Sequence, residues 1–197
     1  MKWLFSRLLP VVEASVDGVK SAAAIIDVRI GSAPIDVARE VAQLSEGELG
    51  RTIDTTPGAV ANFIGIVRAG QPRPSAVPEA EAESADYADQ QLVALAIEHY
   101  PAMTQASIES MCADASARWP LHRLAVVHRV GTIGVGQPIV FVAAVSAHRA
   151  AAFDACEYVV DVLKTEAPFW KKALYADGGH WVEAKATDLQ RRQRWSR

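Results

Sequence analysis

Hydrophobic positions at intervals of three and four residues predict two helices in the first two thirds of the chain. The first covers about residues 34–44, and its apolar face consists of Ile35, Ala38, Val41 and Leu44. The second begins at Pro101 and ends before Pro120, because proline suits the first turn of a helix and disfavours helix in the residue before it. Its apolar face consists of Ile108, Met111, Cys112, Ala115 and Trp119. Cys112 is therefore predicted to be a core residue.

The same spacing predicts a third helix over about residues 147–165, with Ser146 as its N-cap and Pro168 at its end. The residues predicted to face inward are Phe153, Cys156, Val160 and Leu163. This helix matters most for function, because charged residues gather at both of its ends.

Aliphatic and β-branched runs predict strands between and after these helices. The runs cover residues 24–30, 58–68, 92–99, 124–130, 138–145, 169–175 and 180–184. The glycine-rich connection GTIGVGQ predicts a hairpin between the fourth and fifth runs, and Asp177-Gly178-Gly179 predicts a turn between the last two. Since hairpins dominate although helices and strands are interleaved, we expect an α+β fold with mainly antiparallel sheet.

Composition adds limits to this picture. Half of the 197 residues are hydrophobic, 22% are charged and the formal net charge is −3, so an anion site must be local and overall charge does not favour nucleic acid. The two cysteines form no CxxC motif, which suits a reducing compartment, and we expect a cytoplasmic protein without a metal or cofactor. No apolar run approaches the roughly 20 residues needed to span a bilayer.

Three segments lie outside the regular pattern. Residues 1–22 are predicted to be an N-terminal extension, and a secretory leader is disfavoured because Arg7 and Pro10 interrupt its apolar stretch. Residues 69–86, rich in proline and glutamate, are predicted to form a flexible loop inserted into a domain of residues 23–185. The loop is either an inert insertion or a lid near Arg68. Residues 186–197 are predicted to be a basic, solvated tail.

Cationic residues mark both ends of the third helix. In SAHR, His148 and Arg149 fall in the first turn, where backbone N–H groups favour an anion; either a phosphate or carboxylate neutralises them, or they face solvent. In LKTEAPFWKK, Lys164 suits the last helical turn, and Lys171 and Lys172 follow beside large apolar rings. One interpretation is a pocket for an anion, in which neighbouring cations and apolar walls lower the pKa of a lysine. The plainer interpretation is a solvated helix end.

The two cationic ends are too far apart for one small ligand. Lys164 lies 16 positions after His148, which corresponds to about 24 Å along a straight helix. If both ends serve one site, a second copy of the chain must supply one of them, as a symmetric dimer does twice.

These stretches resemble the large, catalytic subunit of molybdopterin synthase. The resemblance is strongest over residues 95–182 and is carried by EHYPAMT (98–104), the run from RWPLHR to HRAAAF (118–153) and LKTEAPFWKKA (163–173). FIGIVR (63–68) matches the family's strand before a flexible loop. The resemblance implies an α/β-hammerhead fold with an additional, mainly antiparallel sheet subdomain.

The resemblance also implies an enzyme of molybdenum cofactor biosynthesis. Members of this family form a homodimer within a heterotetramer that includes two small ubiquitin-like sulfur-carrier subunits. They transfer sulfur from the carrier's C-terminal thiocarboxylate to cyclic pyranopterin monophosphate, forming the dithiolene of molybdopterin. No metal ion is needed by the matching residues, and the order of the two sulfur additions stays open.

Matched position by position, Lys164 and Lys171 correspond to the family's catalytic lysines. The anion-binding pair corresponds to His148 and Arg149, supplied by the neighbouring protomer. The expected substrate-binding residues are Ile66, Val67, Arg68, His148, Arg149 and Lys172. Ala173 stands where the family has an acidic residue, which leaves one substrate contact open.

Two other functions compete with this one. Cys156 could carry a persulfide, although its place on the apolar helix face disfavours a reactive thiol. The chain could instead be a non-catalytic binding module for a ubiquitin-like partner or a phosphorylated ligand. A nucleic-acid role for RRQRWSR is weaker, because that cluster is short and terminal.

Overall fold

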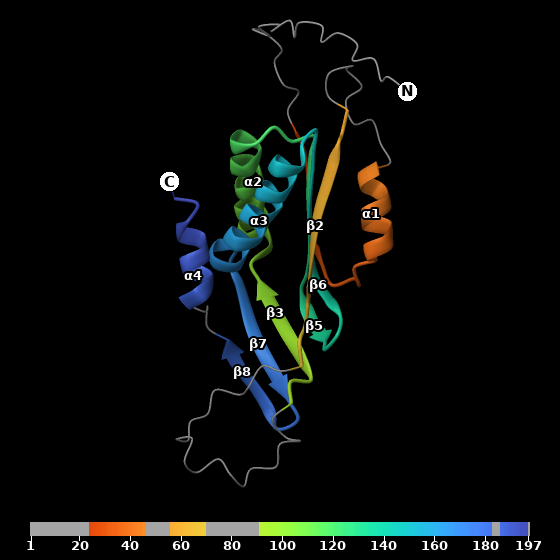
Figure 1. The fold of residues 1–197 in the computed structure, drawn as a ribbon. Helices are drawn as coiled ribbons and strands as arrows, with labels where there is room; N and C mark the ends of the chain where they lie inside the picture. Colours follow the sequence, from red (N-terminus) through yellow and green to blue (C-terminus); the bar gives the residue numbers. More distant parts are fainter. Residues whose placement is uncertain (1–23, 46–55, 70–90, 183–185, 197) are drawn as a thin grey trace, which may run out of the picture.

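The computed structural model describes residues 24–45, 56–69, 91–182 and 186–196 (Figure 1). The elements in chain order are β1 Ile25–Gly31, α1 Val37–Ser45, β2 Ala59–Ile66, β3 Ala94–His99, α2 Pro101–Arg118, β4 Arg123–Arg129, β5 Gly131–Gly134, β6 Pro138–Ser146, α3 Arg149–Glu166, β7 Phe169–Tyr175, β8 Gly178–Val182 and α4 Ala186–Gln193. The predicted extension at residues 1–22 and residues 70–86 of the predicted loop lie outside these ranges.

The first sheet has the strand order β1-β4-β6-β2. Strands β1 and β4 are parallel, whereas the β4–β6 and β6–β2 pairs are antiparallel. Helices α2 and α3 cover one face, and α1 lies on the other side of the sheet (Figure 1). The two cores follow from strand alternation: Val126, Val142 and Ala144 pack toward α2 and α3, while Phe141 and Ala143 pack with residues around α1.

The second sheet has the order β5-β3-β7-β8, and all its pairs are antiparallel. The predicted hairpin is confirmed for β4 and β6, but its connection is more than a turn. It contains β5, which pairs with β3 because the fully buried Ile133 belongs to the core of the second sheet. The α+β class and the mainly antiparallel sheets are therefore confirmed.

The start of α3 differs from the prediction in one residue's role. The N-cap is His148, and Ser146 is the last residue of β6. The Ser146 hydroxyl donates to the carbonyl of Pro120 at 2.7 Å and accepts from the His148 N–H at 3.4 Å. Gly58 is required beside this junction, since a Cβ there would lie 2.3 Å from the Ala147 carbonyl oxygen.

The prediction that Phe153 faces inward is wrong, since this side chain is 63% exposed. The buried arc of α3 runs through Ala152, Ala155, Val159 and Val162, which pack between the first sheet and α2. Phe153 lies beyond the edge of that arc.

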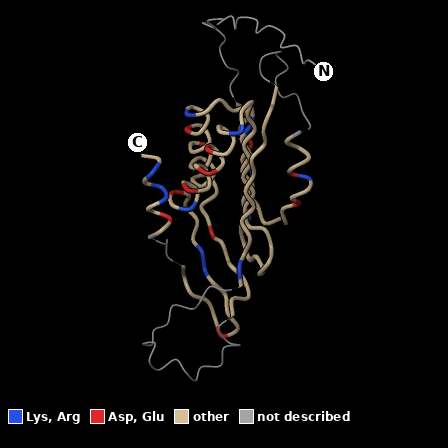
Figure 2. Tube along the Cα trace, viewed as in Figure 1, with Lys and Arg blue, Asp and Glu red and all other residues tan. Residues whose placement is uncertain are grey.

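The C-terminal segment, predicted to be a basic, solvated tail, is mostly exposed but is ordered against the rest of the chain. It forms α4, which lies against α3 (Figure 2), where its arginines pair with acidic residues of that helix. The physical cause is Asp161, a carboxylate only 2% exposed, which accepts hydrogen bonds from Arg194 at 3.0 Å and from the Trp195 indole at 2.9 Å. A buried carboxylate needs such partners.

Candidate active site

The two predicted catalytic lysines lie on consecutive elements, α3 and β7. Lys164 is in the last turn of α3, and its ammonium lies 3.6 Å from the carboxylate of Asp188 on α4. Lys171 lies in β7, close enough to both residues for each to affect its pKa. Pro168 ends the helix between them, and its carbonyl accepts a hydrogen bond from Thr104 at 3.3 Å. The chain reversal that follows α3 thus brings the lysines together.

Lys171 is the more enclosed of the two lysines. Burial lowers its pKa, and the positive charge of Lys164 lowers it further, while Asp188 acts in the opposite direction. A lowered pKa makes an ammonium a better proton donor near neutral pH, and the remaining charge still stabilises an anion. The predicted effect of neighbouring cations and burial is therefore present at Lys171.

An aromatic stack adjoins this lysine pair. The His128 ring lies 4.0 Å from the ring of Phe169, with 16° between their planes. Burial lowers the pKa of His128 to about 4, and Lys171 and His99 lower it as well, although the Arg129 carbonyl 2.8 Å from Nδ1 raises it. No local sequence signal marks His128 beyond its place in a β-branched run, and none marks Asp188 in the C-terminal segment.

Lys172 lies on the opposite face of β7 from Lys171, because successive side chains of a strand alternate. Its ammonium lies over the ring of Trp181, 5.6 Å from the centroid, and these two residues are register partners between β7 and β8. The structure thus separates Lys172 from the lysine pair.

Ala173, which stands at the family's acidic position, is 2% exposed and packs in the core of the second sheet.

Arg68 lies two residues after the end of β2 and is exposed. Val67, next to it, is 2% exposed, and its N–H and carbonyl bond to Gln137 and Gly136 at 3.1 and 2.8 Å. The turn requires a φ of +81° at position 136, which glycine adopts readily and residues with a Cβ rarely do. Ile66 is 52% exposed and sits at an irregularity in the β2–β6 register. A rigid backbone thus presents an exposed guanidinium at the edge of the sheet.

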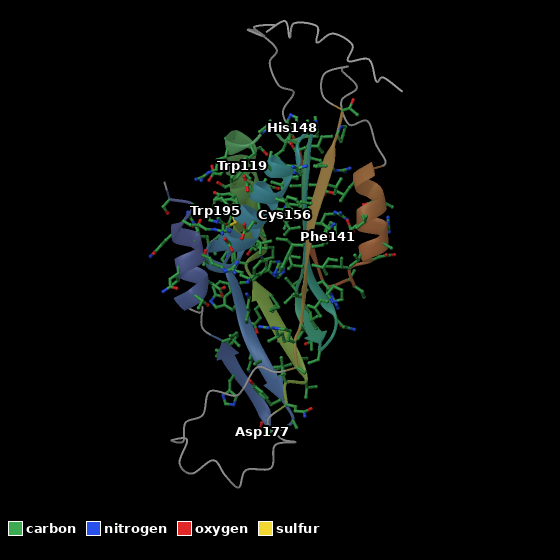
Figure 3. The ribbon with its side chains drawn as sticks, in the orientation of Figure 1. Trp119, Phe141, His148, Cys156, Asp177 and Trp195 are labelled. Atoms are coloured by element: carbon green, nitrogen blue, oxygen red, sulfur yellow. The ribbon has the colours of Figure 1, made fainter. Side chains whose placement is uncertain are left out.

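His148 and Arg149 are exposed at the start of α3 (Figure 3), far from the lysine pair of the same chain. The helix runs without interruption from Arg149 to Glu166, so its ends are about 25 Å apart. One chain does not bring the predicted anion-binding pair and the lysines together.

The cysteines lie in the core, as predicted. Cys112 is fully buried, Cys156 is 6% exposed, and burial raises the pKa of each thiol to about 12. Thiols in this state are poor nucleophiles, which disfavours the persulfide alternative. Among the residues that the structure describes, no cluster of His, Cys, Asp and Glu could hold a metal ion, and no helix is long and apolar enough to cross a membrane.

Comparison with known proteins places this geometry in a class. The family model described as MoaE protein matches residues 30–166. The molybdopterin synthase catalytic subunits of Pseudomonas aeruginosa and Mesorhizobium japonicum are 40% and 44% identical, each over 85% of this chain and over 97% and 92% of their own lengths. A solved structure, the molybdopterin biosynthesis MoaE protein from Burkholderia ambifaria, is 38% identical and has a TM-score of 0.64. The match covers 88% of this chain and 99% of that protein's chain.

The class defined by this fold and these relatives is that of enzyme subunits in molybdenum cofactor biosynthesis, the catalytic subunits of molybdopterin synthase. The matched range contains Arg68, both ends of α3 and Lys164. The chain belongs to the MoaE family. Both the expected membership of this chain in the family and the expected fold are therefore confirmed.

Proposed function

We propose that this protein transfers sulfur from the C-terminal thiocarboxylate of a small ubiquitin-like carrier to cyclic pyranopterin monophosphate, forming the dithiolene of molybdopterin. The observation that carries the proposal is the lysine pair: Lys164 in the last turn of α3 and Lys171 in β7 are neighbours, and burial together with the charge of Lys164 lowers the pKa of Lys171. Such a pair suits an anionic carrier terminus and an anionic intermediate.

The chemistry requires a carbon–sulfur bond to form on the pterin and another to break on the carrier. The thiocarboxylate sulfur attacks a carbon of the pterin side chain, and a carbon–oxygen bond at that carbon breaks, its oxygen leaving as water or as the released oxygen of the cyclic phosphate ester. Carrier and pterin are then joined as a thioester. Water then adds to the thioester carbonyl, and collapse of this tetrahedral intermediate leaves sulfur on the pterin and a carboxylate on the carrier. Lys164 stabilises the oxyanion or transfers a proton, and Lys171 shares that electrostatic load. Two carriers are consumed for each dithiolene.

The substrate phosphate needs cations outside the lysine pair. Arg68 supplies one from the same chain, and His148 and Arg149 supply others from a second copy, because the length of α3 separates them from their own lysines. The working unit is thus a homodimer that binds one carrier at each end. Ile66, Val67 and Lys172 stay predicted substrate contacts.

Lys164→Ala tests the proposal against a non-catalytic binding role. The purified variant is mixed with thiocarboxylated carrier and cyclic pyranopterin monophosphate, and carrier binding and dithiolene product are measured separately. We expect binding within about three-fold of the unmodified protein and a loss of product formation of at least about 100-fold, the usual scale for a general acid–base or oxyanion group.

Cys156→Ala serves as the matched control, since it removes a buried thiol without touching the lysines. It should retain sulfur transfer. If Lys164→Ala kept full product formation, the chain would act as a binding module, and if Cys156→Ala abolished it, the persulfide route would replace the proposed one.

A further inference from the structure

Asp188 occupies an unexpected place for a residue of the C-terminal segment. It lies in the first turn of α4, and its carboxylate is 3.6 Å from the ammonium of Lys164. Its side chain is 24% exposed against 45% for Lys164, so the acidic partner is the more enclosed member of the pair. Its charge also acts on Lys171, although α4 is separated from β7 by the whole of β8 in sequence.

Several contacts other than the Asp188 ion pair attach α4 and the residues after it. Arg192 pairs with Glu166, Arg194 pairs with Asp161, and the Trp195 indole donates to Asp161 at 2.9 Å. The Trp195 ring also packs edge-on against Trp119 and Tyr158, with centroid distances of 5.7 and 5.5 Å. These contacts hold α4, and with it Asp188, against α3.

We propose that Asp188 is a positioning residue for sulfur transfer: it holds the Lys164 ammonium by an ion pair and offsets the repulsion between Lys164 and Lys171. The inference rests on the proposed function of the lysines. Two ammonium groups repel each other, and a carboxylate near both of them offsets that repulsion. The C-terminal helix is then a working part of the site.

The groups around Lys171 set the direction of the expected pH effect. Lys164 comes from α3, Asp188 from α4 and His128 from β4. Because the carboxylate of Asp188 raises the pKa of Lys171, its removal lowers that pKa further. The charged lysine is then lost at a lower pH, and the alkaline limb of the pH–rate profile moves toward neutrality.

The test compares Asp188→Asn with Glu166→Gln in the full chain with its carrier. Glu166 pairs with Arg192 of α4, so its substitution also removes a tie between α4 and α3 but leaves Asp188 in place. For Asp188→Asn we expect kcat to fall about five-fold, the scale of a partly exposed ion pair, with KM little changed and the alkaline limb at lower pH. Glu166→Gln should resemble the unmodified enzyme, and Asp188→Glu should restore most of the rate.

Three results would overturn the inference: an unchanged profile for Asp188→Asn, a faster reaction, or an equal loss in both variants without a pH shift. The last result would mean that the carboxylate only docks α4. NMR titration of isotope-labelled lysine side chains reads the same coupling without turnover. If the unmodified protein made no dithiolene but its lysine titration still moved with Asp188→Asn, the proposed function would fail while the electrostatic coupling stood.

Discussion

His128 shows how a single buried side chain ties stability to pH. Its ring is stacked on Phe169 and 5% exposed, and burial is the main reason that its pKa lies at about 4 instead of 6.5. The folded protein therefore keeps this imidazole neutral where an unfolded chain would protonate it. Below pH 6.5 the unfolded state binds protons that the folded state does not bind, so the free energy of unfolding decreases as the pH is lowered.

We predict that the free energy of unfolding falls by about 3 kcal/mol from this residue between pH 6.5 and pH 4, at roughly 1.4 kcal/mol per unit of pKa difference. Urea denaturation at several pH values measures the loss. His128→Phe keeps an aromatic ring against Phe169 and removes the titration, so its curve should be flatter over this window. An equal slope in both proteins would assign the acid sensitivity to other groups.

At the scale of elements, α4 illustrates stabilisation by a buried charge. Asp161 on α3 is almost completely buried, and Arg194 and Trp195 satisfy it from the C-terminal segment. Figure 3 shows Trp195 and Trp119 close together between α4 and α2, consistent with their edge-on contact. Aromatic packing and a satisfied carboxylate thus anchor a helix of only eight residues.

Trp195→Ala should destabilise the protein by about 2 kcal/mol, less than a fully buried tryptophan, because Trp195 is only partly buried. Chemical denaturation measures this change, and hydrogen exchange of α4 should show faster exchange of its amides. Trp181→Ala is the control: Trp181 is 55% exposed and should cost less than about 1 kcal/mol. Equal effects would show that α4 is not held by Trp195.

Elements with strong periodicity could be predicted from the sequence, and elements set by long-range pairing could not. The face of α2 carrying Ile108, Met111, Cys112 and Ala115 is buried as its spacing predicts. Three features were not predicted from the sequence: the strand β5 inside an expected turn, the exposure of Phe153 on α3, and the packing of α4 against α3. Each depends on a partner distant in sequence, such as β3 for β5 and Asp161 for Trp195.

The candidate site divides along the same line. Lys164 and Lys171 stand out by local charge beside Pro168, the resemblance assigns them as the catalytic lysines, and the structure places them near each other. Asp188 and His128 carried no local signal, because their relation to the lysines comes from the packing of α4 on α3 and from the adjacency of β4 to Phe169 on β7. Strand alternation also separates Lys172 from Lys171, which adjacency in sequence conceals.

At the scale of the whole molecule, the uninterrupted length of α3 determines how many chains the proposed site needs. Its two cationic ends cannot meet within one chain, so the proposed site draws Arg68, Lys164 and Lys171 from one protomer and Arg149 from its partner. An arrangement of this kind allows two inactive variants to complement each other, because a mixed dimer can contain one site with neither substitution.

Mixing Arg149→Ala with Lys164→Ala after dissociation and reassembly should therefore restore activity. Random pairing makes half of the dimers mixed, and one of the two sites in each is intact, so about a quarter of the unmodified activity should return. Mixing Lys164→Ala with Lys171→Ala is the matched control: both lysines come from the same protomer, every site keeps a lesion, and activity should stay at the level of the single variants. Dithiolene formation per mole of chain measures both mixtures. Recovery in the control, or none in the first mixture, would mean that the residues are not shared between protomers in this way, and the phosphate would then have to be bound by cations of a single chain.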